Sequence, residues 1–268
     1  MTLLERKILR LTQIRLGPNK IAWEGVIQPI FDGIKLILKK NLLLVIKQIR
    51  VFLGPLLLFV LVLRMLTILP WFWFFLSLKF SLVIFFCLVA SISYGRILIG
   101  WGAISIFSKL GSIRGILQTL ALEVSLVIFF LVSFCFNSGL NLFIEKITLE
   151  QIFLWVLMLL ILVLTDCNRA PIDLLEGESE LIRGFNLELG RILFIFVFLS
   201  EYGMIIFFSL LGGLGIFFKI SFISFFFLSY CILFIRSCFA RFRYDQLLYF
   251  IWKDFLPLSI YYFIFFNV

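Results

Sequence analysis

The sequence predicts an all-α, polytopic transmembrane helical bundle. Of the 268 residues, 63% are hydrophobic and only 15% are charged, and the mean hydropathy is +1.17. The core of one water-soluble domain of this length cannot bury so much apolar surface. The apolar residues stand in long unbroken runs, close to the roughly 20 residues that a helix needs to cross a bilayer. Because backbone groups in lipid must satisfy their own hydrogen bonds, such runs are expected to be helices.

The first 50 residues are expected to form interfacial amphipathic helices. From Leu3 to Leu16, apolar residues are broken by several charges, so this stretch cannot span a membrane unaided but can lie at its surface. A Gly-Pro-Asn turn at 17–19 ends it. From Trp23 to Lys40, polar and apolar residues fall on opposite sides of a helix, which is typical of a helix lying at the membrane surface.

Residues 51–268 predict about seven transmembrane helices. Hydropathy places them at about 51–69, 78–93, 113–136, 151–165, 190–211, 217–235 and 247–266. A glycine-containing loop is expected after the second span, and Lys253, Asp254 and Pro257 interrupt the last. Since no repeat, linker or soluble domain stands out, residues 1–268 are expected to form a single integral membrane domain.

The distribution of cations predicts the orientation. With the N-terminal region placed inside, the loops at 95–114, 166–190 and 236–246 fall on the same side. Nineteen of the 24 Lys and Arg residues then lie inside, because only Arg64, Lys79, Lys146, Lys219 and Lys253 lie elsewhere. This arrangement follows the positive-inside rule and places the long acidic loop inside as well.

Several kinds of site are not expected. The chain has no histidine, and its five cysteines show no CxxC spacing, which argues against a zinc site, an iron–sulfur cluster, a His-ligated haem or a disulfide framework. The net charge of +9 arises mostly from loop residues of a membrane protein, so no nucleic-acid partner is expected.

The acidic residues suggest a polar path. Glu123 and Glu201 lie within expected spans, where a carboxylate costs at least about 2 to 3 kcal/mol and is usually functional. Glu188 precedes Glu201 by thirteen residues, about 20 Å along a helix. The path would run from the inner face to mid-membrane. The alternative is that each intramembrane acid is merely satisfied by a local hydroxyl group.

The inner loop at 166–190 carries a dense acidic cluster. Asp173, Glu176, Glu178 and Glu180 stand among apolar residues such as Leu174, which favours a loop that packs against another surface. A solvated loop of like charges is the alternative. Similarly, the basic segment 241–246 is either a contact site or a loop that fixes orientation.

Together these motifs resemble chain 1 of NADH:ubiquinone oxidoreductase, respiratory complex I. The resemblance extends in order and spacing from residue 5 to 258. The motifs are Glu5-Arg6-Lys7, Gln13-Ile14-Arg15, Gly17-Pro18-Asn19, Gln28-Pro29 with Asp32 and Lys35-Leu36, Asn168-Arg169 with Pro171 and Asp173, Glu176-Gly177-Glu178-Ser179-Glu180-Leu181, Gly184-Phe185-Asn186 with Glu188, Glu201-Tyr202, Arg241-Phe242-Arg243-Tyr244-Asp245-Gln246, Trp252-Lys253 and Phe255-Leu256-Pro257.

The resemblance implies a subunit that forms the membrane side of a ubiquinone cavity and couples quinone reduction to proton translocation. It would have no activity alone, because FMN and iron–sulfur clusters reside on partner subunits, and would bind no metal or flavin itself. Its partners would be membrane lipids, other complex I membrane subunits and the quinone-proximal subunits of the hydrophilic arm. Its place would be the mitochondrial inner membrane, with the acidic loop facing the matrix. Implied quinone-site residues are Arg6, Arg15, Asp32, Arg169, Asp173 and Arg183, and implied proton-path residues are Glu123, Asp166, Glu176, Glu178, Glu180, Glu188 and Glu201.

Two positions depart from the family pattern. The family has eight spans, and almost all of the first, which ends at Glu5-Arg6-Lys7, has no counterpart in this sequence. Asp166 stands where the family usually has Glu, which keeps the charge on a shorter side chain.

Three other functions are compatible with parts of the pattern. The matching subunit of a membrane-bound hydrogenase resembles this chain but binds no quinone. A secondary transporter would also use intramembrane acids, although such proteins commonly contain two repeated halves. An assembly scaffold would tolerate neutralisation of Glu123 or Glu201 without loss of activity.

Overall fold

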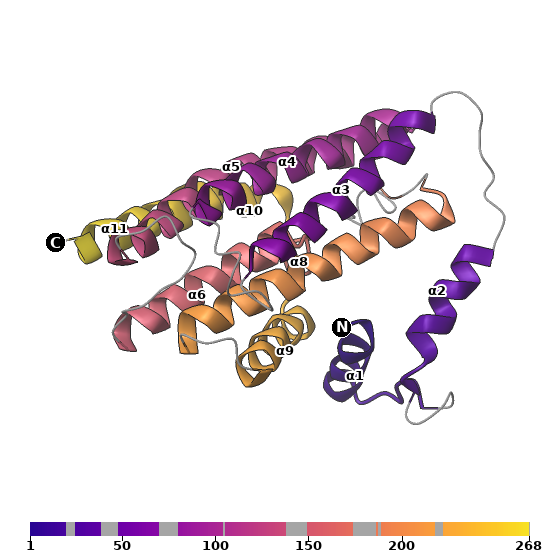
Figure 1. Cartoon of the computed structure of the whole chain (residues 1–268), viewed down its shortest axis with the longest axis horizontal. Coiled ribbons are helices and arrows are strands. Elements are labelled where there is room, and N and C mark those ends of the chain that lie inside the picture. The colour runs from indigo at the N-terminus through magenta and orange to yellow at the C-terminus, as the bar shows by residue number, and fades with distance from the viewer. Residues whose placement is uncertain are drawn as a thin grey trace.

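A computed structural model of the chain describes residues 1–19, 25–38, 48–69, 80–103, 105–137, 149–173, 186, 189–217 and 222–267. All regular secondary structure within these residues is helical, which confirms the predicted all-α class. Figure 1 shows long helices running side by side, with two short N-terminal helices next to one flank of the bundle.

The long helices form the bundle. They are α3 (Gln48–Ile68), α4 (Ser81–Gly102), α5 (Ile106–Asn137), α6 (Leu149–Asp166), α8 (Arg191–Phe217) and α9 (Phe222–Cys238), followed by α10 (Tyr244–Phe250), the π-helical turn η4 (Ile251–Phe255) and α11 (Leu256–Asn267). Among the described residues, five stretches are long and apolar enough to cross a membrane: 51–68, 81–102, 106–131, 192–213 and 244–264. Within α6 and α9, shorter apolar stretches occupy Trp155–Asp166 and Ser224–Cys238. The chain is therefore a polytopic helical bundle.

The expected loop after the second span is mostly helix. α4 continues to Gly102 and α5 begins at Ile106, so the prediction of a long loop at 95–114 was wrong. Gly95 is a helix-packing residue: a Cβ atom there would lie only 2.6 Å from Cδ2 of Leu58 on α3. Small residues let membrane helices approach closely. Glycine therefore marks a helix contact at this position and not a loop.

The polar interruption of the last span is also accommodated inside a helix. The helix continues through η4. There the backbone N–H of Leu256 donates a hydrogen bond to the carbonyl of Ile251, five residues earlier, which is the π-helical pattern. Pro257 follows immediately and has no backbone N–H to donate. A single π turn thus absorbs the local irregularity without ending the helix.

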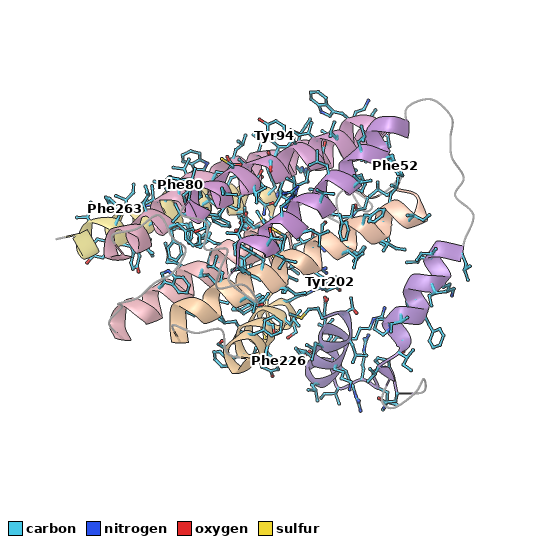
Figure 2. The ribbon with its side chains drawn as sticks, in the orientation of Figure 1. Phe52, Phe80, Tyr94, Tyr202, Phe226 and Phe263 are labelled. Atoms are coloured by element: carbon cyan, nitrogen blue, oxygen red, sulfur yellow. The ribbon has the colours of Figure 1, made fainter. Side chains whose placement is uncertain are left out.

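Aromatic side chains fill the centre of the bundle. Phe85 on α4 is fully buried; its ring centroid lies 5.6 Å from that of Phe207 on α8 and 5.1 Å from that of Phe130 on α5. Other large apolar side chains point outward, as Figure 2 shows for Phe52 and Tyr94, which are 48% and 63% exposed. An apolar interior with an apolar exterior is the pattern expected of a protein in lipid.

Helices form within both N-terminal stretches that were expected to be interfacial. They are α1 (Thr2–Gln13) and α2 (Gln28–Leu38), where 3–16 and 23–40 were predicted; residues 20–24 and 39–47 lie outside the described part of the chain. α1 packs on α9, and α2 packs on α8. Both have a pronounced apolar side, and Ile30 and Phe31 of α2 are 61% and 52% exposed. α1 differs from expectation in one respect, because it buries a charged residue.

Candidate functional site

The buried charge on α1 is Glu5, which is only 5% exposed. The hydroxyl of Tyr202 on α8 donates a 2.6 Å hydrogen bond to Oε2 of Glu5. Arg236, near the end of α9, forms an ion pair with Oε1 of the same carboxylate. Figure 2 shows Tyr202 on the side of α8 that faces α1. A single carboxylate on α1 is thus held by side chains from two other helices, α8 and α9.

Arg169 connects Glu5 to a second acid. Its Nη1 atom lies 3.6 Å from Oε1 of Glu5, and its Nη2 atom lies 3.1 Å from Oε2 of Glu201 on α8. The guanidinium also lies over the Tyr202 ring, 4.7 Å from its centroid. We call Glu5, Arg169, Glu201, Tyr202 and Arg236 the Glu5 cluster.

The Glu5 cluster balances its charge. Glu5 and Glu201 face Arg169 and Arg236, so two negative and two positive groups meet in a largely buried region. Burying unpaired charges would cost several kcal/mol each, and removing one partner of a buried pair leaves the other uncompensated. The cluster therefore ties α1, the segment after α6, α8 and α9 together through contacts that depend on one another.

A second polar region lies where α6 ends. Arg96 on α4 is 7% exposed and donates from Nη2 to the backbone carbonyl of Asp166 at 2.9 Å. Gln118 on α5 donates to the carbonyl of Thr165 at 3.0 Å. These side chains add hydrogen bonds to carbonyl groups at the end of the helix, both of which also accept from Asn168. Asp166 itself is 5% exposed.

A small cavity separates Asp166 from the Glu5 cluster. Its volume is about 20 Å³, and its polar lining includes Arg96, Asp166, Asn168, Ser200 and Glu201. Within the described part of the chain, Nη1 of Arg96, Oδ2 of Asp166 and Oδ1 of Asn168 are buried without a hydrogen-bond partner. A polar space of this size can hold about one water molecule. The cavity thus offers a polar connection between Asp166 and Glu201.

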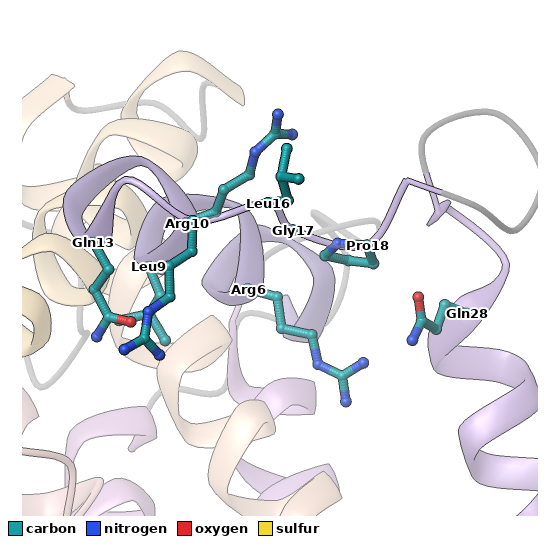
Figure 3. A pocket seen from close by; sticks show the side chains of 9 residues that line it. Arg6, Leu9, Arg10, Gln13, Leu16, Gly17, Pro18 and Gln28 are labelled. Carbon is teal, nitrogen blue, oxygen red and sulfur yellow. The ribbon is translucent and has the colours of Figure 1, made fainter.

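A larger pocket opens between α1, the turn after it and α2. Its volume is about 450 Å³. Figure 3 shows Arg6 and Arg10 extending from α1 around it, with Gln28 of α2 opposite. We call this space the N-terminal pocket; Arg6, Leu9, Arg10, Gln13, Arg15, Leu16, Gly17, Pro18 and Gln28 line it.

Charge in the N-terminal pocket is mainly positive. Three of its nine lining residues are arginines. Arg6 forms a 2.9 Å ion pair with Asp32 on α2, and both side chains are nearly half exposed. The pocket combines these cations with apolar surface from Leu9 and Leu16, so it suits a ligand with a polar head and an apolar body.

The predicted site residues fall into distinct places. Arg6 and Arg15 line the N-terminal pocket, and Asp32 lies beside it. Arg169 and Glu201 belong to the Glu5 cluster. The structure describes three further predicted positions. Asp166 lies at the small cavity, and Glu123 is partly buried on α5. Asp173 is buried, and its carboxylate lies 3.3 Å from the guanidinium of Arg241. Arg183, Glu176, Glu178, Glu180 and Glu188 lie outside the described residues.

Sequence reasoning gave no role to four residues of these sites: Glu5, Arg96, Tyr202 and Arg236. Glu5 and Tyr202 occur in motifs quoted for the family resemblance, but their spacing of 197 positions gives no sign that they touch. Arg96 was placed in a loop that proved to be helix. A charged residue within or just beside a long apolar run was the available signal for Arg96 and Arg236.

Comparison with known proteins adds independent evidence. A family model described as NADH dehydrogenase matches residues 1–267. NADH-ubiquinone oxidoreductase chain 1 of Anopheles gambiae is 36% identical over 99% of this chain and 88% of its own. The proteins of the same name from Aedes aegypti and Artemia franciscana are each 37% identical, over 99% and 97% of this chain and 89% and 90% of their own. The chain therefore belongs to the NADH dehydrogenase family, together with these chain 1 proteins.

Proposed function

We propose that this chain is the membrane subunit of respiratory complex I that forms the membrane side of the ubiquinone cavity. It would act only as part of a proton-translocating NADH:ubiquinone reductase, in the mitochondrial inner membrane with the 166–190 loop facing the matrix. Ubiquinone would be the substrate, and partner subunits would carry the flavin and the iron–sulfur clusters. Support comes from the similarity to NADH-ubiquinone oxidoreductase chain 1 proteins and from the polytopic fold.

The N-terminal pocket supports a role as the quinone portal. Its arginines can donate to quinone carbonyl oxygens, and its apolar lining can accept part of an isoprenoid tail. Arg6, Arg15 and Asp32 are the residues of this pocket region that we assign to the quinone. For Asp173 and Arg183 the same role rests on the family resemblance. To Arg169 we assign the role of linking Glu5 and Glu201, because it lies between these two carboxylates.

One observation carries the coupling proposal: Arg169 contacts both Glu5 and Glu201. Glu5 is adjacent in sequence to Arg6, which lines the pocket, so α1 carries both a pocket residue and the carboxylate that contacts Arg169. Glu201 lies in a transmembrane helix and borders the small cavity that leads to Asp166. Proton movement would continue through Glu123, Glu176, Glu178, Glu180 and Glu188.

Two measurements test this function. An azido-quinone analogue, photolysed in the intact membrane complex, should label peptides between Arg6 and Asp32 or between Asp166 and Arg191, and excess natural quinone should prevent the labelling. Competed label found only on neighbouring subunits would contradict the cavity proposal. In parallel, Glu201→Gln should assemble but lose coupled activity, whereas a scaffold would retain it. Asp254→Asn makes the same chemical change at an exposed position and serves as the control.

A further inference from the structure

An apolar groove, distinct from the small cavity and the N-terminal pocket, lies at the end of the bundle where α6 and α9 end and α10 begins. Its volume is about 270 Å³, and eleven apolar side chains line it. Leu157 and Leu164 of α6 contribute to one wall, and Leu247 and Phe250 of α10 contribute to another. We call it the inner groove. It is separate from the N-terminal pocket, with which it shares no lining residue.

The inner groove is elongated along the helices. Leu157 and Leu164 both line it and are seven residues apart on α6, which corresponds to about 10 Å along the helix axis at ~1.5 Å per residue. The groove therefore runs into the membrane from the end of α6, in the direction that an acyl chain takes in a bilayer. Phe239 and Phe242 line it near the mouth and are 60% and 46% exposed.

Two arginines are sequence neighbours of a residue that lines the inner groove, and one of them, Arg241, is paired with Asp173 at 3.3 Å. Arg241 and Arg243 flank Phe242 in sequence, and the backbone N–H of Phe242 donates a 2.9 Å hydrogen bond to the carbonyl of Pro171, another lining residue. Arg243 pairs with Asp245 at 3.5 Å, but both side chains are about three-quarters exposed. Such a pair contributes at most about 1 kcal/mol. An anionic group at the mouth can therefore compete with Asp245 for Arg243.

We propose that the inner groove binds one acyl chain of an anionic phospholipid, whose phosphate is held by Arg243. Apolar lining along the groove and an exposed arginine at its mouth match the two parts of such a lipid, and basic pockets between membrane helices bind anionic headgroups in this way. The proposal does not depend on the quinone role, because it uses a different cavity.

Photolabelling of the native complex tests the proposal directly. The complex is reconstituted in nanodiscs that contain phosphatidylglycerol with a diazirine on one acyl chain, or phosphatidylcholine with the same chain. After photolysis, peptide mass spectrometry should find phosphatidylglycerol adducts on residues 157–164 and 235–250, competed by unlabelled phosphatidylglycerol. Equal labelling by both lipids would mean ordinary boundary lipid and overturn the headgroup assignment. Two results would overturn the lipid assignment. One is labelling that a long-tailed quinone prevents and unlabelled phosphatidylglycerol does not. The other is the absence of adducts on these peptides, which would mean that a protein segment fills the groove.

Two variants make the test specific. Leu157→Trp places a larger side chain in the groove at a position that is 40% exposed, and should lower the adduct yield severalfold. Leu117→Trp, 46% exposed on α5, is the matched control and should leave it unchanged. Arg243→Gln should lower the preference for phosphatidylglycerol over phosphatidylcholine about fivefold, the order expected for one basic residue near an anionic surface. An unchanged preference in this assembled variant would contradict the role of Arg243.

Discussion

The Nη2 atom of Arg169 lies 3.1 Å from Oε2 of Glu201, a carboxylate within a transmembrane helix. The same guanidinium lies 3.6 Å from Glu5 on α1. Arg169 can therefore respond to charge changes on either side. If Glu201 becomes neutral, attraction toward Glu5 dominates; if Glu5 becomes neutral, Glu201 and Arg169 form the stronger pair. The predictions that follow test this arrangement and the packing that supports it.

Neutralising Glu201 should impair turnover more than assembly. In Glu201→Gln the amide retains the size of the side chain, but it cannot exchange a proton as a carboxylate does. We expect quinone reduction coupled to proton movement to fall by roughly a hundredfold or more, the lower end of the range for loss of a proton-transferring group. NADH:ubiquinone activity and proton uptake in vesicles, each normalised to assembled complex, provide the measurement. Wild-type coupling in this variant would refute the prediction.

Loss of the Glu5 carboxylate should loosen α1. Glu5→Ala leaves Arg169 and Arg236 without this partner and removes the acceptor of the Tyr202 hydroxyl. Breaking a buried ion pair costs about 3 to 5 kcal/mol. We expect a lower thermal midpoint of the complex and faster proteolysis within α1. Asp245→Asn, in a pair that is about 75% exposed, should change stability by less than about 1 kcal/mol.

A side chain at Gly95 should disturb the contact between α3 and α4. The Cβ atom of Gly95→Ala would meet Leu58 at 2.6 Å, and overpacking of this kind costs about 1 to 3 kcal/mol. The yield and the thermal midpoint of the assembled complex should both fall. Gly33→Ala is the control, since no atom lies within 4 Å of its added Cβ. Similar losses in both variants would argue against a specific packing role for Gly95.

Arg15 should contribute to the affinity for quinone. Its side chain lines the N-terminal pocket, and a hydrogen bond to a charged donor contributes about 1.5 to 3 kcal/mol when fully formed. Because the pocket is open, we expect Arg15→Gln to raise the KM for a short-chain quinone only severalfold, with a smaller change in kcat. Lys253→Gln removes an exposed cation outside the pocket and should leave the KM unaltered.

Cysteine reactivity should report on burial at the end of α6. Desolvation raises the pKa of the Cys167 thiol, so less of the nucleophilic thiolate is present at pH 8. In the folded complex, N-ethylmaleimide should modify the exposed Cys238 before Cys167. After denaturation in SDS, both should react. Equal rates before denaturation would mean that the end of α6 is open to solvent.

Local sequence properties explain what could be predicted. Hydropathy and helix period identified the helices because both depend on neighbouring residues; α3 at Gln48–Ile68 closely matches the predicted 51–69. The same reasoning failed at Gly95, which lies inside a helix, whereas the predicted interruption at Lys253 to Pro257 coincides with the π turn η4. A glycine or proline that ends a helix in water is tolerated in a membrane helix when neighbouring helices or a π turn accommodate it.

The sequence by itself determined a polytopic helical membrane protein with amphipathic helices at its start, and it identified Glu123 and Glu201 as acids in costly positions. It could not determine which charges meet. Glu5 and Tyr202 are 197 positions apart and lie 2.6 Å from each other only because α1 packs beside α8 and α9. The tertiary structure alone decided that Glu5 is buried and that Arg169 is shared, since such contacts depend on helix packing and rotation that no local pattern encodes.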